Sequence, residues 1–374
     1  TGLVSIASNQ ATINPSNNFE LNTAYHIEID NTVFKDAANN NYIGIVTNTI
    51  LNFVSEANQT NIFNPLNGNW SDVANWSLGR LPIATDNITI ETGKTVNLDV
   101  ANASINDINI NVSGTLNIFS GNALTINGNL SQNGTFNILS AATSNGSLIV
   151  KGTSVGNVTY LRHVTTNWHL ISSPVESQAI NALVGQVNTS GNKYAVAPYI
   201  NNTTSLLRWN YFTDNTGTND IATAGNFSVA KGYTLQKSNV AGTIAFTGTL
   251  NTTDRSIGIT DGGDDPAGNR WNLVGNPYTA ALHGNNAADG TNNFLKVNID
   301  ANNLDPTRAG LYLWNGAAPY EIKSLDDAAF SIAAGQAFFV HAPDNGGTSV
   351  SFTEDMQTHQ TGNVFLRTTN SYPE

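Results

Sequence analysis

The stretch WHLISSP at residues 168–174 returns, with substitutions, as WNLVGNP at residues 271–277. The two stretches share Trp at the first position, Leu at the third and Pro at the seventh. Further matches follow at nearly the same offset: LRWN at 207–210 with LWN at 313–315, and FSVAKGY at 227–233 with FSIAAGQ at 330–336. Self-similarity at a fixed spacing indicates that the C-terminal two thirds of the chain contains one structural unit used twice.

The residues shared by the two copies are Trp, Leu, Pro, Gly and Phe, whereas acids and histidines are not shared. Large apolar residues and turn residues maintain a fold, while a duplicated binding site would retain polar groups. We therefore interpret the repeat as a duplicated folding unit, with Trp168 and Trp271 as matching core anchors. Ligand specificity is then expected in the loops where the copies differ.

Composition points to a β-rich extracellular protein. Charged residues make up 11% of the 374 positions, against roughly a quarter in an average soluble protein. Asn, Thr, Ser and Gly take the remaining polar positions, and these residues favour turns and exposed strand faces over helices. The length predicts two or three domains.

Charge and cysteine usage exclude several classes of protein. The net charge is −12, and the 15 Lys and Arg residues are scattered singly, so nucleic acids and anionic membranes are not expected partners. No cysteine is present, which excludes disulfides and thiolate metal sites. No apolar run approaches 18 residues, so membrane insertion is not expected. Because Thr1 is not an initiator Met, we expect the sequence to be an internal part of a longer protein.

Residues 1–56 alternate in the manner of short strands separated by turn residues. The stretch ATINPSNNFELNTAYHIEIDNTVFKDAANNNYIGIVTNTILNFVSE at 11–56 resembles the C-terminal half of the bacterial Ig-like domain of S-layer and other surface proteins. The matching positions are Pro15, Leu21, Tyr25, Ile27, Asp36, Asn39 and Phe53. The resemblance implies an Ig-like sandwich that lacks its first strands. Since natural sheets avoid open edges, we expect Thr1 to lie inside a domain and further domains to precede it.

Residues 57–163 have a shorter period. NVSGTLNIFS at 111–120 and SQNGTFNILS at 131–140 match at a spacing of 20 residues, which is about one rung of a β-solenoid. The upstream stretch GNWSDVANWSLGRLPIATDNITI at 68–90 resembles the opening of such segments in secreted proteins of the Bacteroidetes. This resemblance implies that Trp70 and Trp76 cap the open end of the solenoid.

Residues 164–260 form copy one of the repeat, and residues 261–374 form copy two with the start of a following linker. Copy two, through RWNLVGNPY, LYLWNG, GQAFFV and SFTEDM, resembles a β-sandwich region that precedes the sorting domain in proteins exported by the type IX secretion system. TGNVFLRTTNSYPE at 361–374 resembles the strand that leads into that sorting domain. The resemblance implies export to the outer cell surface. The predicted fold is all-β and modular: a partial Ig-like sandwich, a short β-solenoid, and two tandem β-sandwich units packed as a pseudo-symmetric pair.

No catalytic residues are predicted. Gly152–Gly156 fits the G-x-S-x-G nucleophile pattern, which requires a strand, a sharp elbow and a helix. The segment NVTYLRHV that follows reads as a strand, so a solenoid turn is favoured. His163 and His169 lie close in sequence, but no H-E-x-x-H motif accompanies them, which favours a surface or cap role. No acid pair has a spacing that predicts glycoside hydrolysis.

Three loops are candidate Ca²⁺ sites, because Ca²⁺ takes six to eight oxygen ligands and closely spaced Asp and Asn supply them. They contain Asp261, Asp264 and Asp265 in the linker, Asp300, Asn302, Asn303 and Asp305 in copy two, and Asp30, Asp36 and Asn39 in the Ig-like segment. None has the spacing of an EF-hand loop. Asp and Asn also stabilise turns without an ion, so plain turns are the alternative.

Aromatic residues are the candidate ligand contacts. Trp209, Trp314 and Tyr320, with Tyr211 and Tyr312 near them, are predicted at strand or loop-edge positions, where flat rings could stack on sugars. The alternative is a core role, because a Trp recurs at matching positions of both copies and large aromatics dominate sandwich cores.

These observations predict a non-catalytic, extracellular structural or adhesive segment of a large surface protein: a stalk, an adhesin or a surface-layer component. Its expected partners are other domains of the same polypeptide, surface polysaccharide or neighbouring copies. The alternative is a carbohydrate-binding accessory region of a secreted polysaccharide-degrading enzyme. A hydrolase or lyase in the solenoid groove is disfavoured, since residues 97–156 carry one base, Lys151, and two acids, Asp99 and Asp107.

Overall fold

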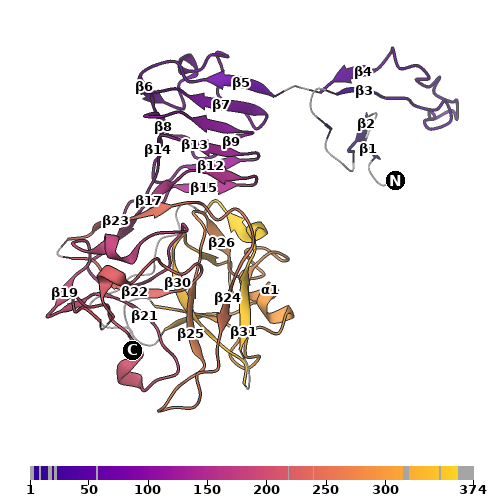
Figure 1. The fold of residues 1–374 in the computed structure, drawn as a ribbon. Coiled ribbons are helices and arrows are strands. Elements are labelled where there is room, and N and C mark those ends of the chain that lie inside the picture. Colours follow the sequence, from indigo (N-terminus) through magenta and orange to yellow (C-terminus); the bar gives the residue numbers. More distant parts are fainter. Residues whose placement is uncertain are drawn as a thin grey trace. The chain divides into compact units, whose positions relative to one another are not determined.

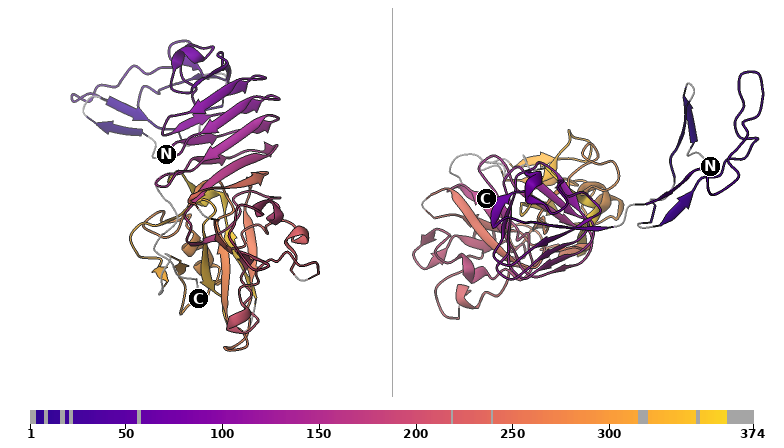
Figure 2. Two further views of the ribbon diagram at one scale, coloured as in Figure 1. Left: turned by 90° about the vertical axis from the view of Figure 1, so that its left-hand side faces the viewer. Right: turned by 90° about the horizontal axis from the view of Figure 1, so that it is seen from above.

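Strands dominate the chain, which confirms the predicted all-β class (Figures 1 and 2). The structure, a computed structural model, describes residues 4–360 except 8, 9, 16–18, 21, 22, 56, 57, 218, 239, 315–319, 345 and 346. Two compact units divide the chain, residues 1–60 and 61–374, and each is described by itself. No helix within the described ranges is long and apolar enough to cross a membrane.

The first unit consists of two short hairpins. Its strands are β1 (Val4–Ala7) paired with β2 (Gln10–Ile13), and β3 (Ala24–His26) paired with β4 (Asn52–Val54). The rings of Phe19, Tyr25 and Phe53 contact one another at centroid distances of 4.6–5.7 Å. None of the described residues of this unit is buried. Leu21, one of the positions that carry the Ig-like resemblance, lies outside the described residues.

The second unit begins with the predicted β-solenoid, built from three parallel sheets (Figure 2). The first sheet contains β5 (Gln59–Ile62), β7 (Asp86–Ile90), β10 (Ile108–Ile110), β13 (Leu130–Gln132) and β16 (Ser154–Val155). The second contains β6 (Asn67–Asn69), β8 (Thr95–Leu98), β11 (Thr115–Ile118), β14 (Thr135–Leu139) and β17 (Val158–Val164), and the third β9 (Ala103–Ile105), β12 (Ala123–Ile126) and β15 (Ser147–Val150). Thr115 pairs with Thr95 and Thr135, so the 20-residue period is the register of the rungs.

Alternation along each strand divides the solenoid into a core and a surface. In β11, Leu116 and Ile118 are completely buried and stack on their counterparts in the rungs above and below. Asn117 lies between them on the other face, where it donates to Asn97 at 3.0 Å and accepts from Asn137 at 2.9 Å. Side-chain amides in register thus add a second ladder of hydrogen bonds to the backbone ladder.

Two tryptophans close the first end of the solenoid. Trp70 and Trp76 are 1% and 2% exposed, and their rings meet edge to face at 4.8 Å. The indole nitrogen of Trp76 donates to the carbonyl of Trp70 at 2.9 Å, so the polar edge of the buried ring is satisfied. The turn between them is the short 3-10 helix η1 (Val73–Asn75), capped by Asp72. These rings occupy the place expected for a cap.

Strand β17 joins the solenoid to copy one. One edge pairs in parallel with β14, and the other pairs antiparallel with β23 (Gly242–Gly248) along seven residues. The result is one sheet of six strands, and a single hydrophobic core runs through both regions. β17 is therefore both the last rung of the solenoid and the opening strand of copy one, although the sequence analysis placed it in the solenoid alone.

Each copy packs two sheets against each other. Copy one has β18 (Trp168–Ile171), β22 (Tyr233–Gln236) and β21 (Val196–Pro198) in that order, opposite β17 and β23. Copy two has β25 (Trp271–Gly275), β30 (Ala337–His341), β27 (Leu311–Leu313) and β28 (Glu321–Lys323), opposite β24 (Arg255–Ile259) and β31 (Thr348–Phe352). Because β24 pairs with β31, it belongs to copy two, and the boundary predicted at residue 260 moves to a point before Arg255.

The remaining elements are short. Copy one carries β19 (Thr189–Ser190), β20 (Lys193–Tyr194), η2 (Ile180–Leu183), η3 (Ser205–Leu207) and η4 (Ile221–Thr223). Copy two carries α1 (Phe294–Asp300), η5 (Glu354–Met356) and a three-stranded sheet of β29 (Ser331–Ile332), β26 (Ala281–His283) and β32 (Gln357–Thr358). One α-helix among the described residues agrees with the expectation of few helices.

The copies interlock through reciprocal backbone contacts. Ser172 of copy one donates to the carbonyl of Gly335 in copy two at 2.9 Å, and Gly275 of copy two donates to Ala230 in copy one at 2.9 Å. Ala230 and Gly335 both have left-handed backbones, with φ of 59° and 66°, so they are equivalent positions. The match between FSVAKGY and FSIAAGQ therefore shifts by two residues, because letter-by-letter alignment would place Gly232 opposite Gly335.

Candidate functional site

The four-stranded sheet of copy two has one face in a core and the other against copy one. In β27, Leu311 and Leu313 are completely buried in the core of copy two. Tyr312 and Trp314 point to the opposite face, as the two-residue period of a strand requires. The alternating letters of LYLW at 311–314 thus place two aromatic rings outside the core of their own copy.

An aromatic cluster forms on that face. Tyr312 lies directly across from Phe339 of β30, and its ring packs edge to face on Trp271 at 4.5 Å. Tyr320 packs on Phe339 at 5.6 Å. Copy one contributes Tyr199, which packs on Phe339 at 4.8 Å. The cluster therefore bridges the two copies.

The partly buried rings of the cluster enclose a hollow of about 190 Å³, lined by Tyr199, Trp271, Tyr312, Tyr320 and Phe339. A second hollow of about 390 Å³ adjoins it at Trp271, lined by Arg208, Gly263, Asp264, Asp265, Asn269, Arg270, Trp271, Arg308 and His341. We call the two together the Trp271 groove. It has an aromatic end and a charged end, and the Trp271 ring belongs to both.

The three arginines of the charged end differ in their pairing. Arg208 donates to Asp265 at 2.7 Å and to the carbonyl of Gly268 at 3.2 Å. Arg270 lies 4.0 Å from Asp305 and 3.7 Å from Asp344, too far for hydrogen bonds to either. Arg308 is exposed, and its guanidinium lies 5.9 Å from the centre of the Trp271 ring, within reach of a cation–π interaction.

A buried pair supports the floor of the groove. His341 Nδ1 lies 3.0 Å from Asp305 Oδ2. Burial lowers the pKa of His341, and the nearby Arg308 lowers it further. Burial opposes ionisation of Asp305, but hydrogen bonds from Thr307 and the neighbouring His341 outweigh it and lower the pKa of that carboxyl. At neutral pH, Asp305 is an anion with its charge directed at protein groups, and His341 is neutral.

The predicted aromatic residues meet with different outcomes. Tyr320 lines the groove, whereas Trp314 is only 5% exposed and lies beneath Tyr320 at 5.2 Å. Trp209 is partly buried and packs on Tyr199 at 5.2 Å. Tyr211 lies elsewhere, in a hollow beside Trp168. One of the three candidate ligand contacts thus reaches the groove, and the other two support it from below.

Trp209 and Trp314, the tryptophans of the LRWN and LWN matches, do not occupy equivalent positions. Tyr199 pairs with Trp209 in copy one, and the register of Leu313 with Glu321 sets Trp314 opposite Tyr320 in copy two. Since β21 and β27 hold the same place in their sheets, Tyr199 corresponds to Trp314 and Trp209 to Tyr320. The expectation that a Trp recurs at matching positions is therefore wrong, because the Trp precedes the hairpin turn in copy two and follows it in copy one. Asn315, the last residue of the LWN match, lies outside the described residues.

Trp168 and Trp271 are equivalent, but their surroundings differ. Trp168 is 8% exposed, as predicted for a core anchor. Trp271 is only partly buried and lines the groove, so the same prediction is wrong for copy two. A hollow of about 200 Å³ adjoins Trp168 too, lined mainly by polar residues and by Tyr194 and Tyr211.

Sequence reasoning did not identify Trp271, Tyr199, Phe339 and Arg308 as site residues. The sequence did contain one indication of the site, the two-residue alternation in β27. Tyr312 lies between the buried Leu311 and Leu313, so its side chain must face away from the core of copy two. Tyr199 and Phe339 are far apart in sequence, and only the packing of one copy on the other brings them together.

The candidate calcium residues are held by protein groups. Asp265 pairs with Arg208 at 2.7 Å, Asp300 ends helix α1 and pairs with Lys296 at 2.9 Å, and Asp305 accepts from Thr307 at 2.8 Å. Asp261 accepts from the backbone of Gly263, and the carbonyl of Asp264 accepts from Ala267 and Gly268. Asn302 has a left-handed backbone at φ 57°, and Thr348 donates to the carbonyl of Asn303.

The loop of the Ig-like unit follows the same pattern. Asp30 accepts from the backbone and hydroxyl of Thr32, and Asp36 accepts from Ala38 and Asn40. Those hydrogen bonds lower the pKa of both carboxyls. Asn39 has a left-handed backbone at φ 66°. Across the described ranges, no three His, Asp or Glu side chains gather as a metal site. Calcium binding stays a prediction.

The nucleophile-like motif and the two histidines have structural surroundings. Ser154 lies in β16 and is followed by strand β17, where G-x-S-x-G chemistry would need a helix. His163 lies in β17 itself. His169 is buried in β18, and its Nε2 accepts from the backbone of Thr165 at 3.1 Å.

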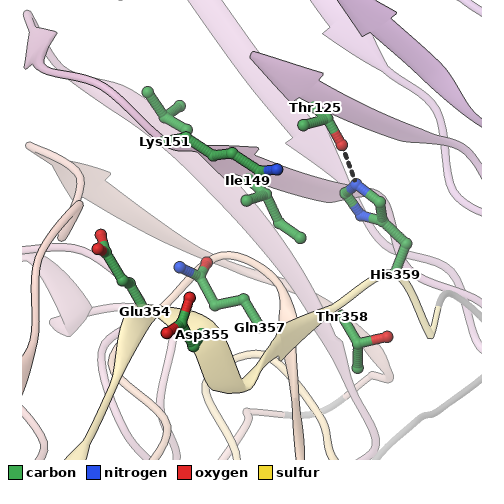
Figure 3. A pocket seen from close by; sticks show the side chains of 9 residues that line it. Thr125, Ile149, Lys151, Glu354, Asp355, Gln357, Thr358 and His359 are labelled. Carbon is green, nitrogen blue, oxygen red and sulfur yellow. Dashed lines mark hydrogen bonds between the residues drawn. The ribbon is translucent and has the colours of Figure 1, made fainter. Parts of the chain in front are cut away.

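Another hollow, of about 490 Å³, lies where the end of copy two meets the side of the solenoid (Figure 3). Lys151 lines it from the solenoid, and Glu354 and Asp355 line it from η5. His359 closes one end, within 2.8 Å of the hydroxyls of Thr125 and Ser147. Burial lowers the pKa of His359 to about 4. This histidine attaches copy two to the third solenoid sheet.

The fold and groove define a modular β protein: an Ig-like unit, followed by a solenoid fused to a duplicated sandwich. Residues 1–55 match the bacterial Ig-like domain family, whose members are typical of extracellular proteins. Residues 62–374 match a family described as a domain of unknown function, DUF8693, and the chain belongs to that family. No curated protein and no solved structure gives a significant match.

Proposed function

We propose that the chain is a non-catalytic, extracellular adhesive segment of a larger surface protein, and that the Trp271 groove is its binding site for carbohydrate. The Ig-like match and the scarcity of charged residues support an extracellular role. The sheet shared by the solenoid and copy one supports a rigid spacer. The observation that carries the binding role is the cluster of partly exposed rings around Trp271.

Sugar rings suit this surface because they present a flat C–H face to an aromatic ring while their hydroxyls stay hydrated. Trp271 and Tyr312 meet edge to face at 4.5 Å, so their faces point in different directions and together form a corner. A hollow of about 190 Å³ is smaller than the roughly 300 Å³ at which drug-sized pockets begin. Its size suits one sugar unit, and the rest of the polysaccharide would continue past Trp271 into the charged end.

The strands fix this corner in advance. Trp271 lies directly across from His341, and Tyr312 directly across from Phe339. Rings held on the strands of one sheet, on either side of β30, lose little freedom when a ligand binds, which favours affinity. A site on strands is also positioned more precisely than one on loops.

The second candidate function is a carbohydrate-binding accessory region of a secreted polysaccharide-degrading enzyme. The same groove supports it, since both functions require a sugar site on a rigid support. The two differ in the ligand: an accessory region binds the polysaccharide that its enzyme degrades, whereas an adhesin binds the glycans of a cell surface. Sequencing the whole gene product separates them, because the accessory role requires a catalytic domain in the same polypeptide.

We further propose that a Bacteroidetes-type cell exports the protein through the type IX pathway. The support is the resemblance of copy two and of residues 361–374 to regions near type IX sorting domains; residues 361–374 lie outside the described ones. Export of the full gene product should stop in a strain that lacks the type IX translocon. Continued appearance in the medium or on the surface of that strain would contradict the proposal.

Affinity electrophoresis of the 374-residue chain in gels containing plant, algal and microbial polysaccharides tests the binding role. We expect retardation by at least one polysaccharide, and a loss of about tenfold or more in affinity for Trp271→Ala. Tyr211→Ala is the control, because Tyr211 lines a separate hollow beside Trp168 in copy one, and it should bind as the parent does. Unretarded migration in every gel would overturn the carbohydrate role.

A further inference from the structure

We propose that the Trp271 groove selects acidic sugars: a pyranose ring stacks at the aromatic end, and its carboxylate or sulfate group pairs with Arg308 and Arg270. This inference rests on the proposed carbohydrate-binding function and names the chemical class of the ligand. The chain itself carries a net charge of −12, so attraction to an anion must come from a local site.

Arginine is concentrated at this one place. The sequence contains seven arginines, and three of them, Arg208, Arg270 and Arg308, line the charged end of the groove. They come from three separate segments: the turn before Trp209, the segment before β25 and the segment before β27. The same lining also contains two carboxylates, those of Asp264 and Asp265. The lining itself thus holds more guanidinium groups than carboxylates, while Asp305 and Asp344 lie next to Arg270.

Arg208 does not contribute to ligand binding in this scheme. Its guanidinium is occupied by Asp265 at 2.7 Å and by two backbone carbonyls, those of Thr203 and Gly268, at 3.2 Å each. These bonds attach the linker loop to copy one. Arg208 and Asp265 neutralise each other, so the charge available to a ligand is that of Arg270 and Arg308, with Asp264 exposed at the edge.

Arg308 is the better-placed donor. Among the described residues, no carboxylate lies within 4 Å of its guanidinium, while it lies 5.9 Å from the centre of the Trp271 ring. The planar fork of a guanidinium matches the two oxygens of a carboxylate or sulfate. Its position over the Trp271 ring places that fork at the junction of the charged and aromatic ends of the groove.

The acids nearby do not cancel this charge. Asp305 is 7% exposed and already accepts from Thr307 at 2.8 Å and faces His341 at 3.0 Å. Asp344 lies 3.7 Å from Arg270, where the pairing is loose enough to be replaced by a ligand anion. An exposed pair of that kind contributes little to stability, so exchanging its partner costs little.

The test uses one polymer with and without its charge. Isothermal titration of the 374-residue chain compares polygalacturonate with its methyl ester, which has the same rings but no carboxylates. A neutral galactan and a sulfated galactan complete the set. We expect the acid form to bind at least tenfold more tightly than the ester. Raising NaCl from 0.05 to 0.5 M shortens the Debye length roughly threefold and should remove most of that advantage.

Variants assign the effect to residues. Arg308→Gln should lower affinity for the acid form about tenfold, to the level of the ester, and leave binding of the ester unchanged. Arg308→Lys keeps the charge without the fork and should lie between. Trp271→Ala should weaken both forms. Arg255→Gln is the matched control, because Arg255 pairs with Glu176 away from the groove, and melting curves verify that each variant is folded.

Each outcome decides the matter. Equal affinity for acid and ester together with no preference for the sulfated over the neutral galactan would overturn the inference while leaving the carbohydrate role in place, and so would an anion preference that survives Arg308→Gln. A lack of binding to all four polymers would remove the carbohydrate role for these ligands and the inference with it. Tight binding of the sulfated galactan, abolished by Arg308→Gln, would support the anionic class and assign the charge to sulfate.

Discussion

Copy one and copy two share a strand order but are attached differently to the rest of the protein. Copy one is joined to the solenoid along its opening strand β17, which pairs in parallel with β14 of the solenoid and antiparallel with β23 of copy one over seven residues. The opening strand of copy two, β24, pairs within the described residues with β31 of its own copy. Copy two meets the solenoid through side chains, including His359 and Thr279, whose hydroxyl donates to the carbonyl of Leu148 at 2.9 Å, and through one backbone bond, from Leu148 to the carbonyl of Thr279 at 3.4 Å.

The same contrast appears around the tryptophan that the copies share. Trp168 is buried, whereas Trp271 keeps part of its ring accessible and stands between an aromatic hollow and three arginines. Duplication therefore separated two tasks: one copy became the joint to the solenoid, and the other retained an open face. The difference teaches that equivalent letters in a repeat need not keep equivalent roles once one copy is built into a larger sheet.

The largest expected effect comes from breaking the joint. Tyr160→Ala removes a completely buried ring from β17 and should lower the free energy of unfolding by about 4 kcal/mol. Ile257→Ala in β24, which is only partly buried, should cost about 1–2 kcal/mol. Urea unfolding followed by tryptophan fluorescence measures both. Equal losses would mean that the two opening strands are equally important.

The shared tryptophans should separate stability from binding. Trp168→Ala should lower the free energy of unfolding by about 3 kcal/mol, because it leaves a cavity in a packed region. Trp271→Ala should cost about 1 kcal/mol, since part of that ring is already in water. Thermal denaturation of the two variants beside the parent provides the comparison. A larger loss for Trp271→Ala would make it a core anchor after all.

Acid should weaken the attachment of copy two and spare that of copy one. Burial lowers the pKa of His359 from 6.5 to about 4, so between these values the unfolded chain binds a proton that the folded chain does not. The contribution is fully present above pH 6.5 and is lost as the pH falls towards 4, by about 3 kcal/mol in all. Unfolding measured from pH 7.5 to 4 should show this slope.

His359→Gln is the control for that slope, because Gln can still bond to Thr125 and Ser147 but does not titrate. Asp305 and Asp289 titrate in both proteins. Burial raises the pKa of each carboxyl, but the hydrogen bonds that it accepts outweigh burial and lower that pKa. The difference between parent and variant therefore isolates His359. Parallel stability curves for the two would show that the histidine does not control the attachment.

A smaller effect is expected at the reciprocal backbone contacts. Gly335→Ala would set a Cβ 3.0 Å from the carbonyl oxygen of Ser172, at a φ of 66°, and should cost about 1–2 kcal/mol. Ala230 already has the corresponding backbone at φ 59°. Ala230→Gly relieves that strain but loses a buried methyl group, so it should change stability by less than about 1 kcal/mol. Differential scanning calorimetry can resolve the two.

The smallest effect is expected from removing divalent cations. Asp265 and Asp300 pair with Arg208 and Lys296, which leaves these loops with fewer oxygens for an ion. The melting temperature should change by less than about 1 °C when EDTA replaces CaCl₂. A bound ion would raise it by mass action, so a clear increase with Ca²⁺ would support the calcium prediction for these loops.

The solenoid was predictable because its period is also its register. Residues 20 apart in sequence lie side by side in neighbouring rungs, so local spacing determines the long-range contact. The division of each rung into core and surface likewise follows from strict alternation, as at Leu116, Asn117 and Ile118. In a solenoid, the spacing of similar residues along the sequence therefore predicts which residues are in contact.

The joint and the groove were not predictable in the same way. β17 pairs with a strand that begins 78 residues after it ends, from Val164 to Gly242, and nothing in its own letters distinguishes a rung from an opening strand. The match of FSVAKGY with FSIAAGQ slipped by two residues because a shift of two preserves which side chains face the core. Trp209 and Trp314 match in the sequence alignment, but the strand register shows that Trp209 corresponds to Tyr320 and Trp314 to Tyr199.

The shared strand also makes the length of the solenoid adjustable. An added rung of about 20 residues between β9 and β10 would leave β17, the contacts of His359 with β12 and β15 and the Trp271 groove unchanged, because the rungs before β12 lie beyond those contacts. Each added rung would move the groove by about 4.8 Å along the stack of strands. Insertions of whole rungs would thus set the distance between one unaltered site and the Trp70 and Trp76 cap at the first end of the solenoid.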